Sequence, residues 1–219
     1  MSTDDLNVQY GAGWDAAPGW VNFDSSPSLW LERLPLVGGF IRVNSTRFPA
    51  GVQFGDITRG LPLPAGAAKA VYASHVLEHL SYEDARKAVR NTLALLKPGG
   101  VFRLIVPDLE VRIHRYTAAR AAGDSEAASR LMRETLLGRE SRASSPVGYL
   151  RAMIGNSEHL WMWDEGSVRT LLEEAGFVGI RRCDLGDAAD PDFGVVERHD
   201  RFRDEGLDVR ELAMEARRP

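Results

Sequence analysis

The residues best suited to chemistry in this chain are two histidines, His75 and His159. A neutral imidazole accepts a proton near neutral pH, so either side chain could act as a general base toward a hydroxyl group. His159 lies in an aromatic stretch with Trp161 and Trp163, whose indole rings could form a platform for a bound acceptor. The pattern predicts a proton acceptor beside an acceptor-binding surface. A purely structural place in the core is the alternative for each of these residues.

A second chemical pattern overlaps the first. The run from His75 to His79 matches H-x-x-E-H, the inverted zinc-protease motif, through His75, Glu78 and His79. Zinc binding of that kind needs both histidines on one face of an established helix and a further ligand from elsewhere. The preceding residues instead indicate a strand that ends at His75. We therefore expect no metal, and a zinc hydrolase remains the minor alternative.

A glycine turn near the start of the chain predicts a nucleoside site. Residues 6–15 indicate a strand that breaks at Gly11 and Gly13, where backbone without Cβ can approach a ligand closely. Residues 20–24 indicate a second strand ending in Asp24, whose carboxylate could hold a ribose diol. The third glycine of the dinucleotide fingerprint is missing and its usual spacing is shortened. An ordinary turn between two core strands is therefore the alternative.

Composition narrows the classes of protein. With 219 residues, of which 44% are hydrophobic, the chain can build one sizeable core, which favours a single domain over residues 1–219. The formal charge of -4 argues against a nucleic-acid partner. No basic leader and no run of about 18 apolar residues occurs, so we expect a cytoplasmic protein without a membrane span. The single cysteine, Cys183, cannot form an internal disulfide.

The elements that would position these residues alternate between strands and helices. A helix is predicted from Ser81, which can cap it, to Leu96, and a shorter one over residues 167–175. Further strands are predicted at residues 52–56, 70–74, 101–106, 177–183 and within 207–217. This alternation indicates a mostly parallel sheet with right-handed crossovers.

Taken together, motifs spread over residues 6–183 resemble class I S-adenosylmethionine-dependent methyltransferases, more narrowly the bacterial predicted methyltransferase group of the type 11 kind. The motifs are the glycine turn, Asp24, Gly55-Asp56-Ile57, Leu61-Pro62, the run from Ser74 to Leu80, Leu96 to Gly100, and Glu174 to Phe177. They occur in the family's order. The resemblance implies an α/β, Rossmann-like, doubly wound and mostly parallel seven-stranded sheet, with S-adenosylmethionine as cofactor.

The resemblance also implies roles for individual residues. The implied cofactor contacts are Gln9, Tyr10, Gly11 and Gly13 for the amino-acid part, Asp24 for the ribose, Asp56 and Ile57 for the adenine, and Ser74 for the methionine portion. His75 would lie beside that methionine portion. Two positions depart from the family pattern: Gln9 replaces the usual acid before the first glycine, and Asp15 stands where a third glycine often occurs.

The implied reaction transfers a methyl group to a small-molecule or sugar-type acceptor, such as a hydroxyl, by in-line displacement in which positioning does most of the work. Residues 109–164 are too long for an ordinary crossover, so we expect a helical insertion after the fifth strand that covers the active site. A non-catalytic domain of the same fold and an NAD-dependent Rossmann enzyme are the remaining alternatives. The sequence does not predict the oligomeric state.

Overall fold

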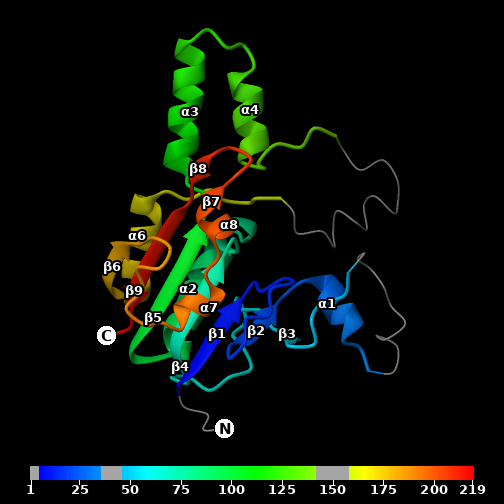
Figure 1. Ribbon diagram of the computed structural model, residues 1–219, viewed down its shortest axis with the longest axis vertical. Coiled ribbons are helices and arrows are strands. Elements are labelled where there is room, and N and C mark those ends of the chain that lie inside the picture. Colours follow the sequence, from blue (N-terminus) through cyan, green and yellow to red (C-terminus); the bar gives the residue numbers. More distant parts are fainter. Residues whose placement is uncertain (1–4, 36–45, 142–157) are drawn as a thin grey trace.

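A seven-stranded sheet forms the centre of the protein (Figure 1). The computed structural model describes residues 5–35, 46–141 and 158–219. The strands of the sheet are β1 (Leu6–Tyr10), β2 (Val21–Asp24), β3 (Val52–Phe54), β4 (Ala68–Ser74), β5 (Leu96–Val106), β6 (Val178–Arg182) and β9 (Leu212–Arg217). Their order is β3-β2-β1-β4-β5-β9-β6, and β9 runs antiparallel to both of its neighbours. The predicted Rossmann-like, mostly parallel sheet of seven strands is confirmed.

Two layers of apolar side chains cover the two faces of this sheet. One layer lies under α2 (Tyr82–Leu95) and α6 (Glu165–Ala175), which pack against each other. The other lies under the short helix α7 (Phe193–Val196). Side chains alternate between the layers along a strand, as in β9, where Leu212 and Met214 enter the first layer and Ala213 enters the second. The parallel strands are therefore buried on both faces.

Local sequence fixes where the main helices begin and end. The Asp84 N–H donates to Ser81 Oγ at 3.2 Å, so Ser81 caps α2 as predicted. Asp164 and Ser167 form a reciprocal capping box at the start of α6. Gly176 ends α6 in the left-handed conformation, with φ of 101°. Among the described residues, no helix is long and apolar enough to cross a membrane.

A helical hairpin extends beyond the carboxyl ends of the strands (Figure 1). It consists of α3 (Leu109–Ala121) and α4 (Ala127–Glu134), which pack side by side after a break at Gly123. Asp108 caps α3 by accepting the Glu110 N–H at 3.0 Å. The hairpin is the first part of the insertion predicted over residues 109–164. Residues 142–157 of that span lie outside the described residues.

The connection between β6 and β9 also reaches the hairpin. It contains α7, α8 (His199–Phe202) and the two-stranded ribbon of β7 (Arg203–Asp204) and β8 (Val209–Arg210). These elements are too short to show a hydrophobic period in the sequence, and none of them was predicted. Figure 1 shows the ribbon at the base of the hairpin. The carboxyl edge of the sheet is therefore flanked by two insertions.

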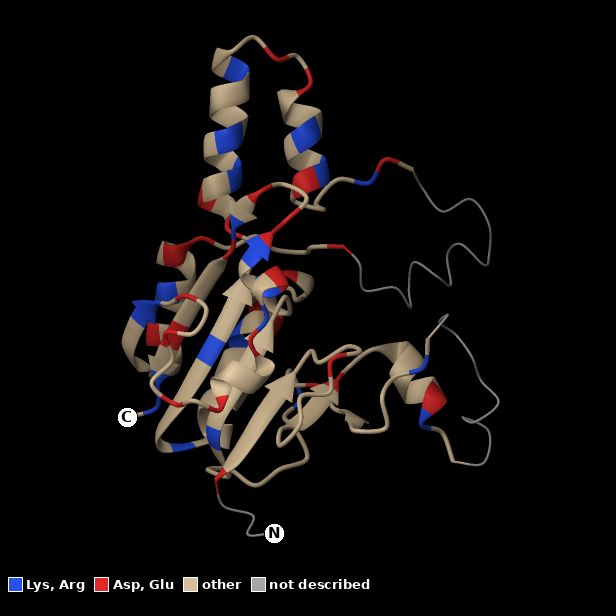
Figure 2. Ribbon diagram, viewed as in Figure 1, with Lys and Arg blue, Asp and Glu red and all other residues tan. Residues whose placement is uncertain are grey.

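Charged residues lie mainly on the helices and connections, while the strands are largely uncharged (Figure 2). An exception is Arg103 on β5, which is 1% exposed. Its guanidinium donates to Glu197 at 2.6 Å, to Glu215 at 2.7 Å and to Asp187 at 2.9 Å. The connection after β6 is thus attached to the sheet through a buried ion-pair network.

Candidate active site

The glycine turn after β1 has the backbone that only glycine adopts readily. Gly11 and Gly13 have φ values of 70° and 54°. A Cβ on Gly11 would lie 2.1 Å from Val76 Cγ2, so a larger residue fits there only if Val76 shifts. A Cβ on Gly13 would meet no described atom within 4 Å. The turn is therefore closed on the side of β4 and open above Gly13, where a ligand could approach.

Asp24 links this turn to the end of β2. Its side chain is 7% exposed. Oδ2 accepts the Gly13 N–H at 2.8 Å and Oδ1 accepts the Ser26 N–H at 2.8 Å. An ionised carboxylate has about four lone-pair sites, so each oxygen keeps one for a further donor. Asp24 can hold the turn and still accept two hydroxyl groups of a ribose.

The predicted adenine contacts differ from each other in exposure. Asp56 Oδ1 accepts from the Thr58 N–H and hydroxyl at 2.9 and 2.7 Å, and its Oδ2 lies 3.3 Å from Arg59 Nε. The Asp56 side chain remains 29% exposed. Ile57 is 5% exposed and belongs to the core layer under α2. The acid is accessible to a ligand, whereas little of the Ile57 side chain is free to stack on a ring.

The side chains of Gln9 and Tyr10 lie on opposite faces of the sheet, although the two residues are neighbours in the sequence. The Tyr10 ring is buried in the core, with its hydroxyl 3.2 Å from Thr92 Oγ1 on α2, so only its backbone faces the turn. Gln9 lies on the opposite face of the sheet and lines a cavity of about 380 Å³ that includes Arg198. Asp15 is paired with Arg198 at 2.8 Å. Asp15, which stands in place of a third glycine, therefore links the glycine turn to the connection after β6.

His75 occupies a strained position directly after β4. Its φ is 55°, a left-handed conformation that is uncommon for residues other than glycine. Its N–H donates to the Ile105 carbonyl at 2.9 Å, and Ser74 Oγ lies 3.0 Å from its Nδ1. Burial, together with the nearby charge of Arg201, lowers the pKa of His75 to about 4. The imidazole is therefore neutral at pH 7, with one ring nitrogen able to accept a hydrogen bond.

His75 and His159 line one cavity of about 310 Å³ at the carboxyl ends of β4 and β5, which we call the strand-end cavity. Its walls come from the strand ends, the hairpin and the connection after β6. Its lining residues are His75, Pro107, Arg112, Glu134, Leu136, His159, Asp200, Arg203, Asp204, Glu205 and Glu211. Burial lowers the pKa of His159 to about 4 as well. The structure thus brings the two predicted histidines together.

The two predicted tryptophans do not line this cavity in the part of the chain that the structure describes. Trp163 is fully buried in the core layer under α2 and α6, so its ring is inaccessible to an acceptor. Trp161 is 44% exposed, and its ring centroid lies 5.0 Å from that of Tyr82 on α2. Of these two tryptophans, Trp161 is the one with an accessible indole surface.

The residues of the zinc-protease motif do not form the helix that such a site needs. Leu77–His79 is a single 3-10 turn, and His75 precedes it in the left-handed conformation. The two histidines of the motif are therefore not presented on one helical face. Glu78 is fully buried, and this burial raises its pKa to about 8.

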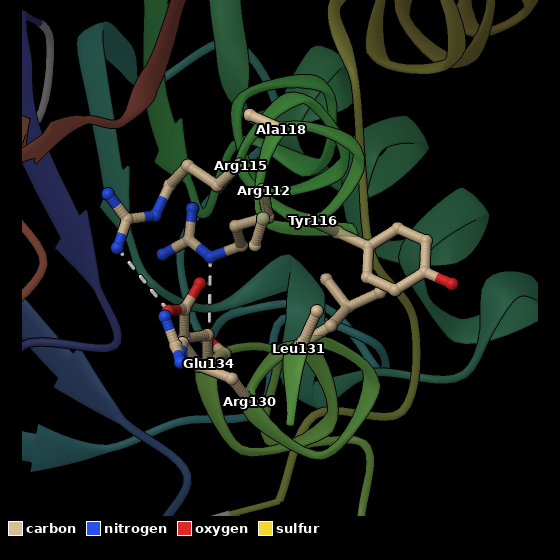
Figure 3. Close-up of a pocket in the computed structure, with 9 residues that line it drawn as sticks. Arg112, Arg115, Tyr116, Ala118, Arg130, Leu131 and Glu134 are labelled. Carbon is tan, nitrogen blue, oxygen red and sulfur yellow. Dashed lines mark hydrogen bonds and ion pairs between the residues drawn. The ribbon is translucent and has the colours of Figure 1, made fainter. Parts of the chain in front are cut away.

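A third cavity, of about 260 Å³, lies between α3 and α4 (Figure 3). It contains three arginines, and each already has an acidic partner. Arg112 pairs with Glu211, Arg115 with Glu134, and Arg130 with Asp124. Figure 3 marks the contacts of Arg112 and Arg115 with Glu134. These pairs leave the hairpin cavity without a free cation for an anionic ligand.

Arg112 and Glu211 are the main site residues that sequence reasoning missed. Arg112 on α3 is 2% exposed and forms a bidentate pair with Glu211, at 2.9 Å for each bond. Both residues line the strand-end cavity. The sequence alone does not reveal this pair, because the pattern of one helix does not show a partner far along the chain. The long connection between β6 and β9 is the feature that could have indicated such a partner.

Comparisons with known proteins agree with this geometry. A family profile described as "Methyltransferase domain" matches residues 16–181, more than half of the chain. No curated protein matches the chain significantly. Among solved structures, a SAM-dependent methyltransferase from Archaeoglobus fulgidus has a TM-score of 0.51 at 11% identity, over 98% of this chain and 86% of that one.

Two further structures show lower similarity. A structure described as PigF with SAH has a TM-score of 0.47 at 16% identity, over 100% of this chain and 52% of that one. Phosphoethanolamine N-methyltransferase 2 from Haemonchus contortus, in complex with S-adenosyl-L-methionine, has a TM-score of 0.48 at 14% identity. The alignment covers 100% of this chain and 50% of that one. The chain thus spans about half the length of these two proteins.

The matched residues contain β2 to β5 and α6, together with Asp24, Asp56, His75 and His159, whereas β1, the glycine turn and β9 lie outside them. The antiparallel β9 between β5 and β6 departs from the strand order of dinucleotide-binding folds, in which six parallel strands follow the order 3-2-1-4-5-6. The profile matches more than half of the chain, which therefore belongs to the methyltransferase family that its motifs resemble, the class I S-adenosylmethionine-dependent methyltransferases.

Proposed function

We propose that the protein methylates a hydroxyl group of a small, sugar-type acceptor bound in the strand-end cavity. The observation that carries this proposal is that His75 and His159 line one cavity at the carboxyl ends of β4 and β5. Open α/β sheets bind their ligands at that edge, where the strand order reverses. The reversal lies between β1 and β4, which places the glycine turn on one side and His75 on the other.

The cofactor would lie along the ends of β1, β2 and β4. Asp24 has acceptor sites left for a ribose diol, and the space above Gly13 is open. Asp56 remains accessible for the adenine amine. When bound, S-adenosylmethionine supplies an electrophilic methyl group on a sulfonium ion. The residues of the chain then have to orient the acceptor in line with that methyl group and remove the hydroxyl proton.

His75 is the proposed general base, because it lines the cavity directly after β4, on the side of the proposed cofactor site. His159 would contact the acceptor from the loop before α6, and Trp161 would offer an exposed ring at its outer side. The hairpin, which lines the cavity through Arg112 and Glu134, would cover the bound acceptor. This arrangement accounts for the length of the insertion after β5.

The lining of the cavity supports a small polar acceptor over a nucleic acid. Glu134, Asp204 and Glu205 contribute carboxylates, which repel a polyanion and accept hydrogen bonds from hydroxyl groups. A volume of about 310 Å³ also falls at the lower end of the range for small-molecule sites.

The proposal is tested by transfer of labelled methyl groups from S-adenosylmethionine to a panel of free and nucleotide-linked sugars. With the acceptor so identified, His75→Ala should lower turnover by about 100-fold or more, the usual contribution of a general base. Cofactor affinity should stay within about twofold, because the side chain acts on the acceptor. The control is His114→Ala, which changes an exposed histidine on α3. Full turnover in His75→Ala would remove His75 from the mechanism.

A further inference from the structure

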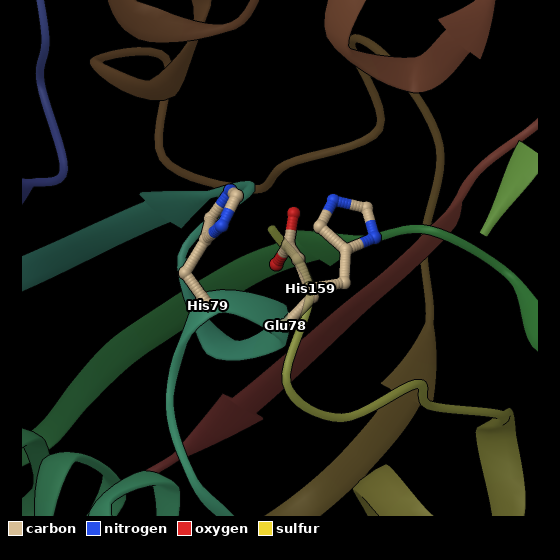
Figure 4. A group of neighbouring side chains, drawn as sticks. All are labelled: Glu78, His79 and His159. Atoms are coloured by element: carbon tan, nitrogen blue, oxygen red, sulfur yellow. The ribbon is translucent and has the colours of Figure 1, made fainter. Parts of the chain in front are cut away.

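Two neighbouring side chains and a third from a distant segment meet beside the strand-end cavity (Figure 4). Glu78 and His79 lie in the 3-10 turn after β4, and His159 lies in the loop before α6. One potential ligand atom from each residue falls within 4.8 Å of the others. Figure 4 shows the Glu78 carboxylate between the two imidazole rings. We call these three residues the Glu78 cluster.

Glu78 is the unusual member of the cluster. Its side chain is 0% exposed, and neither carboxylate oxygen has a hydrogen-bond partner among residues 5–35, 46–141 and 158–219. Burying an unpaired carboxylate is unfavourable, and proteins avoid it by protonating the group, by pairing the charge or by coordinating it to a metal. No described arginine or lysine forms an ion pair with Glu78. The nearest groups are instead the two imidazoles, which are ligands for transition metals.

The two histidines are prepared for such a role. His79 Nδ1 lies 3.0 Å from the Glu158 carbonyl oxygen, which can only accept, so Nδ1 carries the proton and Nε2 keeps a free lone pair. Metal-binding histidines usually donate their second nitrogen to a carbonyl or carboxylate in this way. His159 Nδ1 is buried and has no partner in the described part of the chain. Both rings therefore present an uncommitted nitrogen.

The backbone holds the two ligand-bearing segments together. The Leu160 and Trp161 N–H groups donate to the Glu78 carbonyl at 2.7 and 3.2 Å. The loop before α6 is thus fixed to the 3-10 turn within two residues of His159. A site fixed in this way loses little conformational freedom when an ion binds.

We propose that the Glu78 cluster binds a divalent transition-metal ion, Zn²⁺ in the first place, through Glu78, His79 and His159. Two histidines and one glutamate form a known ligand set of catalytic zinc sites, which leave a fourth position open. Ligand atoms around tetrahedral zinc lie roughly 3.3 Å apart, since zinc–ligand distances are about 2.0–2.1 Å. The present separation of up to 4.8 Å therefore has to close by about 1.5 Å, which side-chain rotation can supply.

This site differs from the one that the H-x-x-E-H pattern predicts. The pattern uses His75, whereas the cluster takes its second histidine from the loop before α6. His75 remains at the strand-end cavity, which His159 also lines. A hydroxyl group that enters this cavity could occupy the open position of the ion, where coordination would ease the loss of its proton to His75. This role rests on the proposed function, but metal binding itself does not.

The test uses the full chain, freed of metal by a chelator and dialysed. Zn²⁺ is added and the bound metal is measured by mass spectrometry, and Co²⁺ is added to a second sample to record its visible absorption. We expect about one ion per chain, with the intense cobalt bands of a four-coordinate site. His159→Ala and Glu78→Gln should weaken binding by about 100-fold or more, since even outer-shell partners of a metal are worth 10- to 100-fold. His114→Ala is the control and should bind like the wild type.

Circular dichroism shows whether each variant folds. If a variant does not fold, the cobalt spectrum of the wild type decides whether the protein has a four-coordinate metal site. A wild type that takes up neither ion at micromolar concentration would overturn the proposal. Unchanged affinity in folded His159→Ala would overturn it too. Calorimetric titration of the same samples with S-adenosylmethionine separates the two hypotheses. If the protein binds S-adenosylmethionine but takes up no metal ion, only the metal site is rejected. If it takes up the metal ion but does not bind S-adenosylmethionine, only the proposed function is rejected.

Discussion

Replacing Arg112 by methionine should destabilise the protein strongly. Arg112 stands at the root of the α3–α4 hairpin, where its guanidinium bonds both carboxylate oxygens of Glu211 at 2.9 Å. It also donates to the Asp108 carbonyl at 3.1 Å. The side chains of Arg112 and Glu211 are 2% and 3% exposed. Methionine fills a similar volume but leaves the Glu211 carboxylate buried without its cation.

Removing one partner of a buried ion pair typically costs about 3–5 kcal/mol, because the remaining charge is uncompensated. Glu211 keeps one bond, from the Asp108 N–H at 3.0 Å, which favours the lower end of this range. In a domain of this size 1 kcal/mol lowers the melting temperature by roughly 2–4 °C. The melting temperature of Arg112→Met should therefore fall by about 6–15 °C.

Urea denaturation and calorimetry measure these quantities directly. Arg130→Met is the matched control on the same hairpin, because Arg130 is 52% exposed and its pair with Asp124 is worth about 0–1 kcal/mol. The double variant Arg112→Met with Glu211→Leu should recover most of the loss, since no charge then stays buried alone. A loss below about 1 kcal/mol in Arg112→Met would refute the assignment of a buried pair at the hairpin root.

Two further predictions concern the cofactor side. Asp24→Asn should weaken S-adenosylmethionine binding by about 10- to 100-fold in a calorimetric titration, because bonds from ribose hydroxyls to a charged acceptor are lost. Affinity equal to the wild type would show that Asp24 does not hold the ribose. Gly11→Ala should be less stable than the matched variant Gly13→Ala by about 1–3 kcal/mol in urea denaturation, because only at Gly11 does the added Cβ meet Val76. Equal stability of the two variants would mean that the turn rearranges.

The sheet could be predicted from the sequence because its strands and main helices carry strong local patterns. Ala70 to Ser74 is a continuous apolar run, and β4 forms there. Ser81 followed by Asp84 indicated the start of α2, and the cap is present. The left-handed glycines of the turn likewise follow from local chemistry, since a backbone with φ of 70° and 54° favours residues without Cβ.

The site could be predicted only in part, because much of it is assembled from distant segments. Arg112 pairs with Glu211, and His79 meets His159, across long stretches of chain. No periodic pattern or motif spacing in the sequence indicates either contact. The burial of Trp163 could not be predicted either. Its aromatic neighbours in the sequence are compatible both with an accessible platform and with the fully buried core position that it occupies. Burial of such residues is decided by tertiary packing, which a single sequence does not reveal.

The central claim is that cofactor and acceptor meet at the strand-end cavity. A crystal structure of the protein with S-adenosylhomocysteine tests it most directly, through the distance from the cofactor sulfur to the imidazole of His159. We expect the sulfur to lie above the ends of β1 and β4 and within about 12 Å of that ring, the span of a small acceptor with a contact of about 3 Å at each end. A sulfur farther from the imidazole of His159 would contradict the account.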